Sequence, residues 1–209
     1  SSKNWNYDIG DGTEAGIPGW GNSEREYYIP SAIKQDGKGS AVISAKRMVV
    51  PAGGQTSKAN PYMCYYGTAC EWTSAKVTTL GKVGFQYGRM EARIKNPKGV
   101  GMWPAFWMLG SDIKTNPWPA CGEIDIMEWF GAFFTAQPNQ VQSAVHTSNN
   151  YGITALFAKQ NVSTMCSEFH RFQLHWTANE ILIGVDDVPT FSYKKPSNAN
   201  TDKWPFDQQ

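Results

Sequence analysis

The sequence lacks a dominant charge, a long apolar run and a sustained helical pattern. Its 19 Lys and Arg residues nearly balance 18 Asp and Glu residues, which gives a formal net charge of +1. This balance argues against a nucleic-acid-binding protein and against an acidic solvating tail. No run of about 18 apolar residues is present, so we expect no membrane-spanning helix. Nowhere does an apolar period of about 3.6 residues hold for four turns, so helices should be few.

Aromatic residues and turn-forming residues are abundant instead. The 209 residues are 13% aromatic and include 20 Gly and 12 Pro, while only 18% are charged. This length suits one large domain or at most two small ones. Many short strands separated by turn signals favour an all-β sandwich of two sheets. The segments predicted as strands are 41–50, 73–80, 84–95, 121–130, 141–147, 168–176, 180–186 and 189–194, with a hairpin turn at Asp186-Asp187.

The four cysteines are Cys64, Cys70, Cys121 and Cys166. No CxxC pair occurs, so a zinc site is not favoured. An even number of cysteines in a loop-rich, aromatic chain favours an oxidised, extracellular setting, although free buried cysteines are the alternative. Three pairings are possible. We favour Cys64 with Cys70, which closes a short loop, and this leaves Cys121 with Cys166.

One predicted strand, 121–130, carries three carboxylates among apolar residues. Residues two apart in a strand share a face, so Glu123 and Asp125 point the same way. Regular pleating would turn Glu128, three residues further on, into the core. A β-bulge near Met127 would return Glu128 to the face of the other two acids, and bulges are frequent beside active sites.

Three acids close together on one strand face favour a catalytic role over a purely structural one. Close like charges raise at least one pKa, so one carboxyl can be ionised while another stays protonated. Glycoside cleavage needs such a pair, a nucleophile and a general acid. The distance between the carboxyls does not follow from the sequence. Solvated acids on an exposed sheet face are the alternative, but the nearby tryptophans suit the stacking of sugar rings; these are Trp103, Trp107, Trp118 and Trp129.

The segment GEIDIMEWFG resembles the catalytic strand of glycoside hydrolase family 16, in the Met-containing form of laminarinase-like endo-β-1,3-glucanases. Nearly the whole chain agrees with this family in order and spacing. The agreeing segments are IPGWGNSEREYY (17–28), YGRMEARIK (87–95), GMWPAFWMLG (101–110), AVHT (144–147) and WPFDQ (204–208). The resemblance implies a β-jelly-roll sandwich of two antiparallel sheets with a concave substrate cleft, formed by one catalytic domain over 1–209.

The resemblance also implies the reaction and the catalytic roles. The expected activity is retaining endo-hydrolysis of β-1,3-glucosidic bonds in laminarin-like β-glucans, without a cofactor. Glu123 would be the nucleophile and Glu128 the general acid and then the base. Asp125 would lie between them, hydrogen-bonded to the nucleophile.

Substrate contacts are likewise implied by position. At the position of Glu26, Gln is commoner in the family, so this residue departs from the pattern. His146 is expected near the substrate, and a purely structural role is the alternative. Arg89 is expected at the cleft floor, with a structural salt bridge as its alternative. Trp103 and Trp107 would be platforms for sugars before the cleaved bond. The full set of expected substrate-binding residues is Asn22, Glu26, Arg89, Trp103, Trp107, Trp118, Trp129 and His146.

Relatives in this family have further strands at both ends. We therefore expect the domain to be incomplete at both ends, with a further segment or a second chain supplying the missing strands. The usual calcium site of the family uses those strands, so calcium is possible in the complete domain but no metal is predicted from these residues.

Alternative functions remain open at this point. Within the family these are cleavage of mixed-linkage β-1,3-1,4-glucan and transglycosylation. Outside enzymes, the alternative is a β-glucan-binding module, but such modules typically lose the catalytic glutamates, and both Glu123 and Glu128 are present. The expected partner is a β-glucan, with no nucleic acid or membrane, and the expected location is extracellular.

Overall fold

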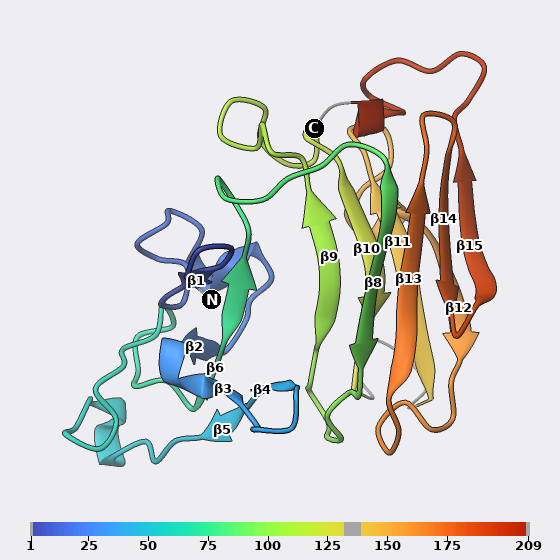
Figure 1. Cartoon of the computed structure of the whole chain (residues 1–209). Helices are drawn as coiled ribbons and strands as arrows, with labels where there is room; N and C mark the ends of the chain where they lie inside the picture. The colour runs from blue at the N-terminus through green and yellow to red at the C-terminus, as the bar shows by residue number, and fades with distance from the viewer. Residues whose placement is uncertain (1, 132–138, 208–209) are drawn as a thin grey trace. The chain divides into compact units, whose positions relative to one another are not determined.

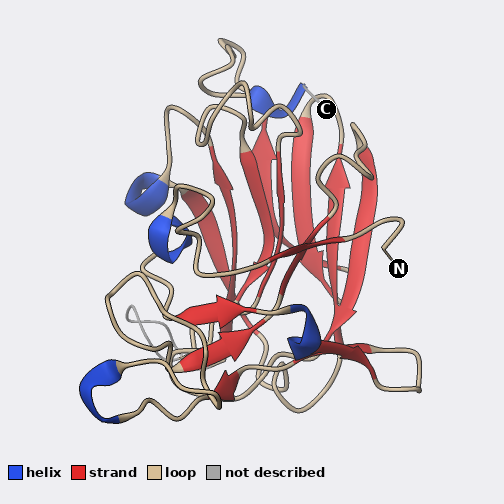
Figure 2. Ribbon diagram, turned by 90° about the vertical axis from the view of Figure 1, so that its left-hand side faces the viewer, coloured by secondary structure: helices blue, strands red, loops and turns tan. Residues whose placement is uncertain are grey.

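A computed structural model describes residues 2–131 and 139–207. The chain divides into two compact units, Ser1–Val83 and Gly84–Gln209, which are described separately below. Strands dominate both units, and the described residues form no α-helix, only short 3-10 turns (Figure 2). No helix in the described part of the chain is long and apolar enough to cross a membrane. The turns are η1 (Pro18–Gly21), η2 (Pro30–Ala32), η3 (Ala52–Gly54), η4 (Gly152–Thr154) and η5 (Pro205–Asp207).

The second unit is a sandwich of two four-stranded antiparallel sheets (Figure 1). The first sheet has the order β12-β11-β10-β9, and the second has the order β15-β14-β13-β8. The strands of the first sheet are β9 (Ala105–Leu109), β10 (Glu123–Glu128), β11 (Gln140–His146) and β12 (Leu156–Asn161). Those of the second are β8 (Gly88–Ile94), β13 (His170–Trp176), β14 (Glu180–Val185) and β15 (Val188–Lys194). The predicted two-sheet architecture is confirmed here.

The core lies between these two sheets. Each strand sends alternate side chains inward, so Ile124 and Val145 of the first sheet meet Leu174 and Ile183 of the second. All four side chains are at most 3% exposed. The opposite face of each sheet is therefore free to carry polar side chains, and this alternation determines where functional groups lie.

Two details of the second unit bear on the strand predictions. Asp186 and Asp187 both have positive φ, which suits the tight β14–β15 hairpin, so the predicted turn is confirmed. Strand β12 was not predicted from the sequence. Its inward side chains are Leu156 and Ala158, but the first residue on its outward face, Phe157, is also apolar. Polar and apolar residues therefore do not alternate cleanly along this strand.

The first unit contains small sheets with the orders β1-β7, β2-β6-β5 and β3-β4. The predicted strands 41–50 and 73–80 are each split in two, because the halves pair with different neighbours. Strand β4 pairs with β3 whereas β5 pairs with β6, and β6 pairs with β2 whereas β7 pairs with β1. The bounds are β1 (Asn6–Asp8), β2 (Glu26–Tyr28), β3 (Ile33–Gln35), β4 (Ala41–Ile43), β5 (Lys46–Arg47), β6 (Trp72–Ser74) and β7 (Lys76–Thr78).

The cysteines follow the prediction only in part. Cys64 and Cys70 form a disulfide with a Cα–Cα distance of 5.1 Å. Cys121 and Cys166 are free thiols, so the second predicted pairing is wrong. Cys121 is separated by Gly122 from Glu123, the first residue of β10. Cys166 follows Met165, which lies near Met127, at the other end of β10.

The contacts of Asn96 establish this separation. Its Nδ2 lies 3.5 Å from the Sδ of Met127 and 3.8 Å from the Sδ of Met165. The segment around Cys166 is thus beside the end of β10 opposite to Cys121. A six-residue strand is roughly 20 Å long, and a disulfide needs Cα atoms within about 7 Å.

Candidate active site

Strand β10 has the predicted bulge. Asp125 pairs with Trp107 of β9, but Met127 pairs with Phe106, so one extra residue lies between them on β10. The pairing of β10 with β11 shifts over the same segment. Because of this extra residue, Ile126 and Met127 both enter the core, at 0% and 1% exposure. Glu128 then returns to the face that carries Glu123 and Asp125.

Two side chains donate hydrogen bonds to Glu128. Trp103 Nε1 donates to Oε1 at 2.9 Å, and Gln142 Nε2 donates to Oε2 at 3.4 Å. The indole of Trp103 also contacts the ring of Phe130. Glu128 is 7% exposed. Burial raises the pKa of Glu128, and the nearby Glu123 carboxyl adds to this, so the group keeps its proton to higher pH than an ordinary glutamate.

Trp118 orients Glu123 from the other end of the strand. Its Nε1 donates a hydrogen bond to Oε2 of Glu123. The indole is 42% exposed and lies beside the imidazole of His146 and the ring of Tyr151, with centroids 5.8 and 5.5 Å away. Burial, followed by the charge of Asp125, raises the pKa of Glu123 to about 8.

Asp125 lies between the two glutamates and is 3% exposed. Burial raises its pKa well above the usual range, and the charge of Glu128 adds to this. A hydrogen bond links its carboxyl to that of Glu123, and such a bond requires a shared proton. This bond raises the pKa of Glu123 and opposes the rise in the pKa of Asp125, so the two carboxyls share one proton and titrate as a coupled pair.

His146 approaches Asp125 from β11. Its Nε2 lies 3.1 Å from Oδ2 of Asp125, and its Nδ1 accepts a hydrogen bond of 3.1 Å from the backbone N–H of Gly152. The backbone donor occupies Nδ1, so in the neutral ring the proton is on Nε2 and faces the carboxylates. Among the described residues, no group of three His, Cys, Asp or Glu side chains is arranged to hold a metal ion.

Trp107 shares the face of the three acids. It lies directly opposite Asp125 on β9, and opposite residues in an antiparallel pair point to the same side. The structure thus places Trp103, Trp107, Trp118 and His146 with the acids. Gln142 was not predicted, although its place four residues before His146 in one strand gives both side chains the same face.

Trp129 does not belong to this group, and its expected role in substrate binding is corrected. The side chain is 3% exposed and packs in the core between the sheets. The bulge explains the difference. Because Glu128 points outward, the next residue along the strand points inward.

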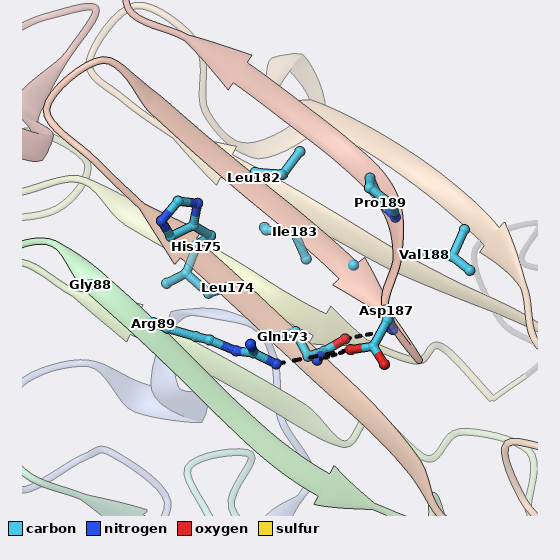
Figure 3. A pocket seen from close by; sticks show the side chains of 11 residues that line it. Gly88, Arg89, Gln173, Leu174, His175, Leu182, Ile183, Asp187, Val188 and Pro189 are labelled. Carbon is cyan, nitrogen blue, oxygen red and sulfur yellow. Dashed lines mark hydrogen bonds and ion pairs between the residues drawn. The ribbon is translucent and has the colours of Figure 1, made fainter.

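Arg89 is the second correction. It lies on β8 in the second sheet, and its neighbour Met90 packs against the core, so Arg89 faces the outer side of the sandwich. There it forms an ion pair of 2.7 Å with Glu91 and lies 3.9 Å from Asp187. Arg89 and Asp187 border an open hollow of about 490 Å³, where Gln173 Nε2 also donates to Asp187 (Figure 3). The alternative reading, a structural ion pair, is the one that the structure supports.

Asn22 and Glu26 lie in the first unit and are linked through Glu24. Asn22 Nδ2 donates to Oε1 of Glu24 at 3.1 Å. The Tyr28 hydroxyl lies 2.6 Å from Oε2 of Glu24 and 2.9 Å from Oε1 of Glu26. Burial raises the pKa of Glu24. Glu24 was not predicted, although its place two residues before Glu26 indicates a shared location.

A sandwich with three carboxyls and several indoles on one sheet face has the groups that glycoside cleavage requires. The model of the glycosyl hydrolases family 16 matches residues 33–209. A β-glucanase of Rhodothermus marinus is 35% identical over 215 residues, which cover 98% of this chain and 65% of that protein. A laminarinase of Flavobacterium sp. UMI-01 is 38% identical, with a TM-score of 0.83 over 100% of this chain and 78% of the other. The endo-β-1,3-glucanase of Pyrococcus furiosus is 33% identical, and its structure has a TM-score of 0.84 over 100% of this chain and 75% of the other.

The chain therefore belongs to glycosyl hydrolases family 16, with the β-jelly-roll fold of its laminarinases. It spans 65% of the length of the Rhodothermus relative and 61% of that of a glucan endo-1,3-β-glucosidase from Cryptopygus antarcticus.

Proposed function

We propose that this protein hydrolyses internal β-1,3-glucosidic bonds of laminarin-like β-glucans. The observation that carries the proposal is the bulge of β10, which places Glu123, Asp125 and Glu128 on one face with raised pKa values. The names of the relatives support the linkage, since laminarinases and endo-1,3-β-glucanases recur among them. The polysaccharide partner follows from the same names.

The proposed mechanism is a double displacement with retention. Glu123 attacks the anomeric carbon while Glu128 transfers its proton to the leaving glycosidic oxygen, which gives a covalent glycosyl-enzyme. Glu128, now ionised, then removes a proton from water, and the resulting hydroxide displaces Glu123. Asp125 takes up the proton that it shares with Glu123 as Glu123 attacks, and so limits the negative charge in the buried site. The hydrogen bonds from Trp103 and Trp118 orient the two reacting carboxyls.

A mixed-linkage specificity is the second candidate. The endo-1,3-1,4-β-glycanase EglC of Rhizobium meliloti is 29% identical over 90% of this chain, and the structure of a non-specific endo-β-1,3(4)-glucanase has a TM-score of 0.80. A binding protein without turnover is less well supported. The β-1,3-glucan-binding protein of Penaeus monodon is 36% identical over 56% of the chain, but Glu123 and Glu128 are both retained here.

The test is the release of reducing ends from laminarin, from barley mixed-linkage glucan and from a soluble cellulose derivative. A ladder of short products from laminarin supports the proposal, whereas release from the mixed-linkage glucan alone favours the second candidate. Binding of laminarin without cleavage contradicts hydrolysis. Retention is tested by NMR of the first anomer formed, which should be the β form.

We also infer that the protein acts outside the cell. The Cys64–Cys70 disulfide supports this, because disulfides persist in oxidising compartments. Thiol alkylation in denaturant, without reductant, of protein purified from culture medium should label two cysteines and leave two protected. Recovery of the native protein from the cytoplasm alone would contradict the inference.

A further inference from the structure

The register of the first sheet places an unassigned aromatic residue on the face of the carboxyls. Asp125 of β10 pairs with Ala144 of β11, and Ala144 pairs with Phe157 of β12. On the other side, Asp125 pairs with Trp107 of β9. Directly opposite residues in antiparallel strands point to the same face, so these four side chains form one row across the sheet.

The packing of β12 confirms the direction of Phe157. Its neighbours Leu156 and Ala158 pack against the core, and side chains alternate along a strand. Phe157 is 51% exposed. A single exposed aromatic residue is ordinary on a protein surface. The feature that distinguishes Phe157 is its place in a row with Asp125 and Trp107.

The adjacent row supplies a polar group beside this ring. Glu128 pairs with Gln142, and Gln142 pairs with Lys159 of β12. The Nζ atom of Lys159 lies 5.9 Å from the centre of the Phe157 ring. An aromatic face next to a hydrogen-bond donor is the combination that holds a sugar ring, with the ring stacking on its apolar face and the donor reaching its hydroxyls.

We propose that Phe157, assisted by Lys159, forms a glucan-binding subsite on the leaving-group side of the cleaved bond. Neighbouring strands are about 4.8 Å apart, so β12 lies about 10 Å from the carboxyl strand β10, which is close to the length of a disaccharide. Trp103 and Trp107 are on the other side of the acids. If these two indoles hold the sugars before the cleaved bond, a glucan that crosses the strands places the sugars after the cleaved bond at Phe157. This inference rests on the proposed function.

The test compares substrates that differ on the leaving-group side. Phe157→Ala should lower kcat/KM for laminarin and for a long β-1,3-gluco-oligosaccharide by roughly three- to tenfold, the loss of one aromatic contact. An aryl β-laminaribioside, whose leaving group is a single ring, should be cleaved at an unchanged rate. Phe157→Tyr keeps the aromatic ring and should cleave laminarin at the rate of the unchanged protein.

The matched control is Phe169→Ala. Phe169 is also a partly exposed ring beside cations, with Arg93 4.1 Å from its centre, but Arg93 lies on the outer face of the second sheet. This variant should cleave every substrate like the unchanged protein. An equal loss on the aryl bioside and on laminarin in Phe157→Ala would overturn the proposal, since it would indicate a general structural effect. An unchanged rate on both would overturn it as well.

A binding measurement separates this inference from the proposed function. In affinity electrophoresis through gels containing laminarin, Phe157→Ala should be retarded less than the unchanged protein, whether or not the protein hydrolyses laminarin. Equal retardation refutes the subsite. Absence of hydrolysis in the unchanged protein, with weaker retardation of the variant, refutes the proposed activity and supports the subsite.

Discussion

Replacing Glu123 by Gln should stabilise the protein at neutral pH while abolishing turnover. Burial and the neighbouring Asp125 raise the pKa of Glu123 from 4.5 to about 8. A carboxyl whose pKa is higher in the folded state contributes stability that is fully present below its unfolded pKa. That contribution is lost as the pH rises through the folded pKa. The wild-type protein therefore loses stability between about pH 4.5 and about pH 8, and a neutral side chain avoids this loss.

The magnitude follows from the difference between the two pKa values. At about 1.36 kcal/mol per pH unit, the difference between 4.5 and about 8 corresponds to at most about 5 kcal/mol above pH 8, and to about 3 kcal/mol at pH 7. The proton shared with Asp125 reduces this, so we expect about 1–3 kcal/mol. Gln retains an oxygen that accepts the hydrogen bond from Trp118. For a chain of this size the gain in Tm is about 3–10 °C.

Thermal unfolding followed by circular dichroism at pH 4 and pH 7 measures this effect. The difference in Tm between Glu123→Gln and wild type should be present at pH 7 and nearly absent at pH 4. Glu168→Gln, at an exposed carboxyl, is the control and should match wild type at both pH values. An equal Tm at pH 7, or a gain of the same size at pH 4, would refute the electrostatic reasoning.

The remaining predictions concern the other acids, their donors and the disulfide. Glu128→Gln should reduce kcat on laminarin by about 10²–10⁴-fold but reduce it much less on an activated aryl glycoside, which needs no proton transfer; steady-state rates on both substrates check this. Asp125→Asn removes a charge that raises the pKa of Glu123, so the acidic limb of the kcat/KM profile should move to lower pH. Trp103→Phe removes a donor that lowers the pKa of Glu128, so the basic limb should move to higher pH. Replacing Cys64 and Cys70 by Ser should cost about 2 kcal/mol in denaturant unfolding, from loss of the short cross-link.

Alternation along strands was sufficient to predict which face of β10 carries the three acids. The third acid would be buried under regular pleating, and burying an unpaired charge is costly, so the bulge followed from the sequence. The same reasoning, extended by one residue, places Trp129 in the core. Its expected contact with sugar came from its nearness in sequence to the acids, which does not determine the face on which a side chain lies.

Long-range relations could not be predicted in this way. The pattern of 84–95 does not reveal that β8 lies in the second sheet, so Arg89 was expected at the wrong surface. The pairing of Cys121 with Cys166 failed for the same reason, because their separation depends on the direction of β10 and on the path of the chain after β12. Phe157 was missed because its strand lacks a clear polar and apolar alternation.

The hydrogen bond from Gly152 to His146 joins a surface turn to the buried acids through a single ring. Gly152 has a φ of 56°, a conformation that residues with a side chain adopt at a cost, so the turn depends on this glycine. Displacing the turn would free Nδ1 and allow the imidazole proton to move there from Nε2, leaving a lone pair facing Asp125. The tautomer of His146 therefore reports the state of the surface turn, and it can be read from the nitrogen chemical shifts of the imidazole. A substitution at Gly152, 6 residues away in sequence, can change this tautomer without altering any of the acids.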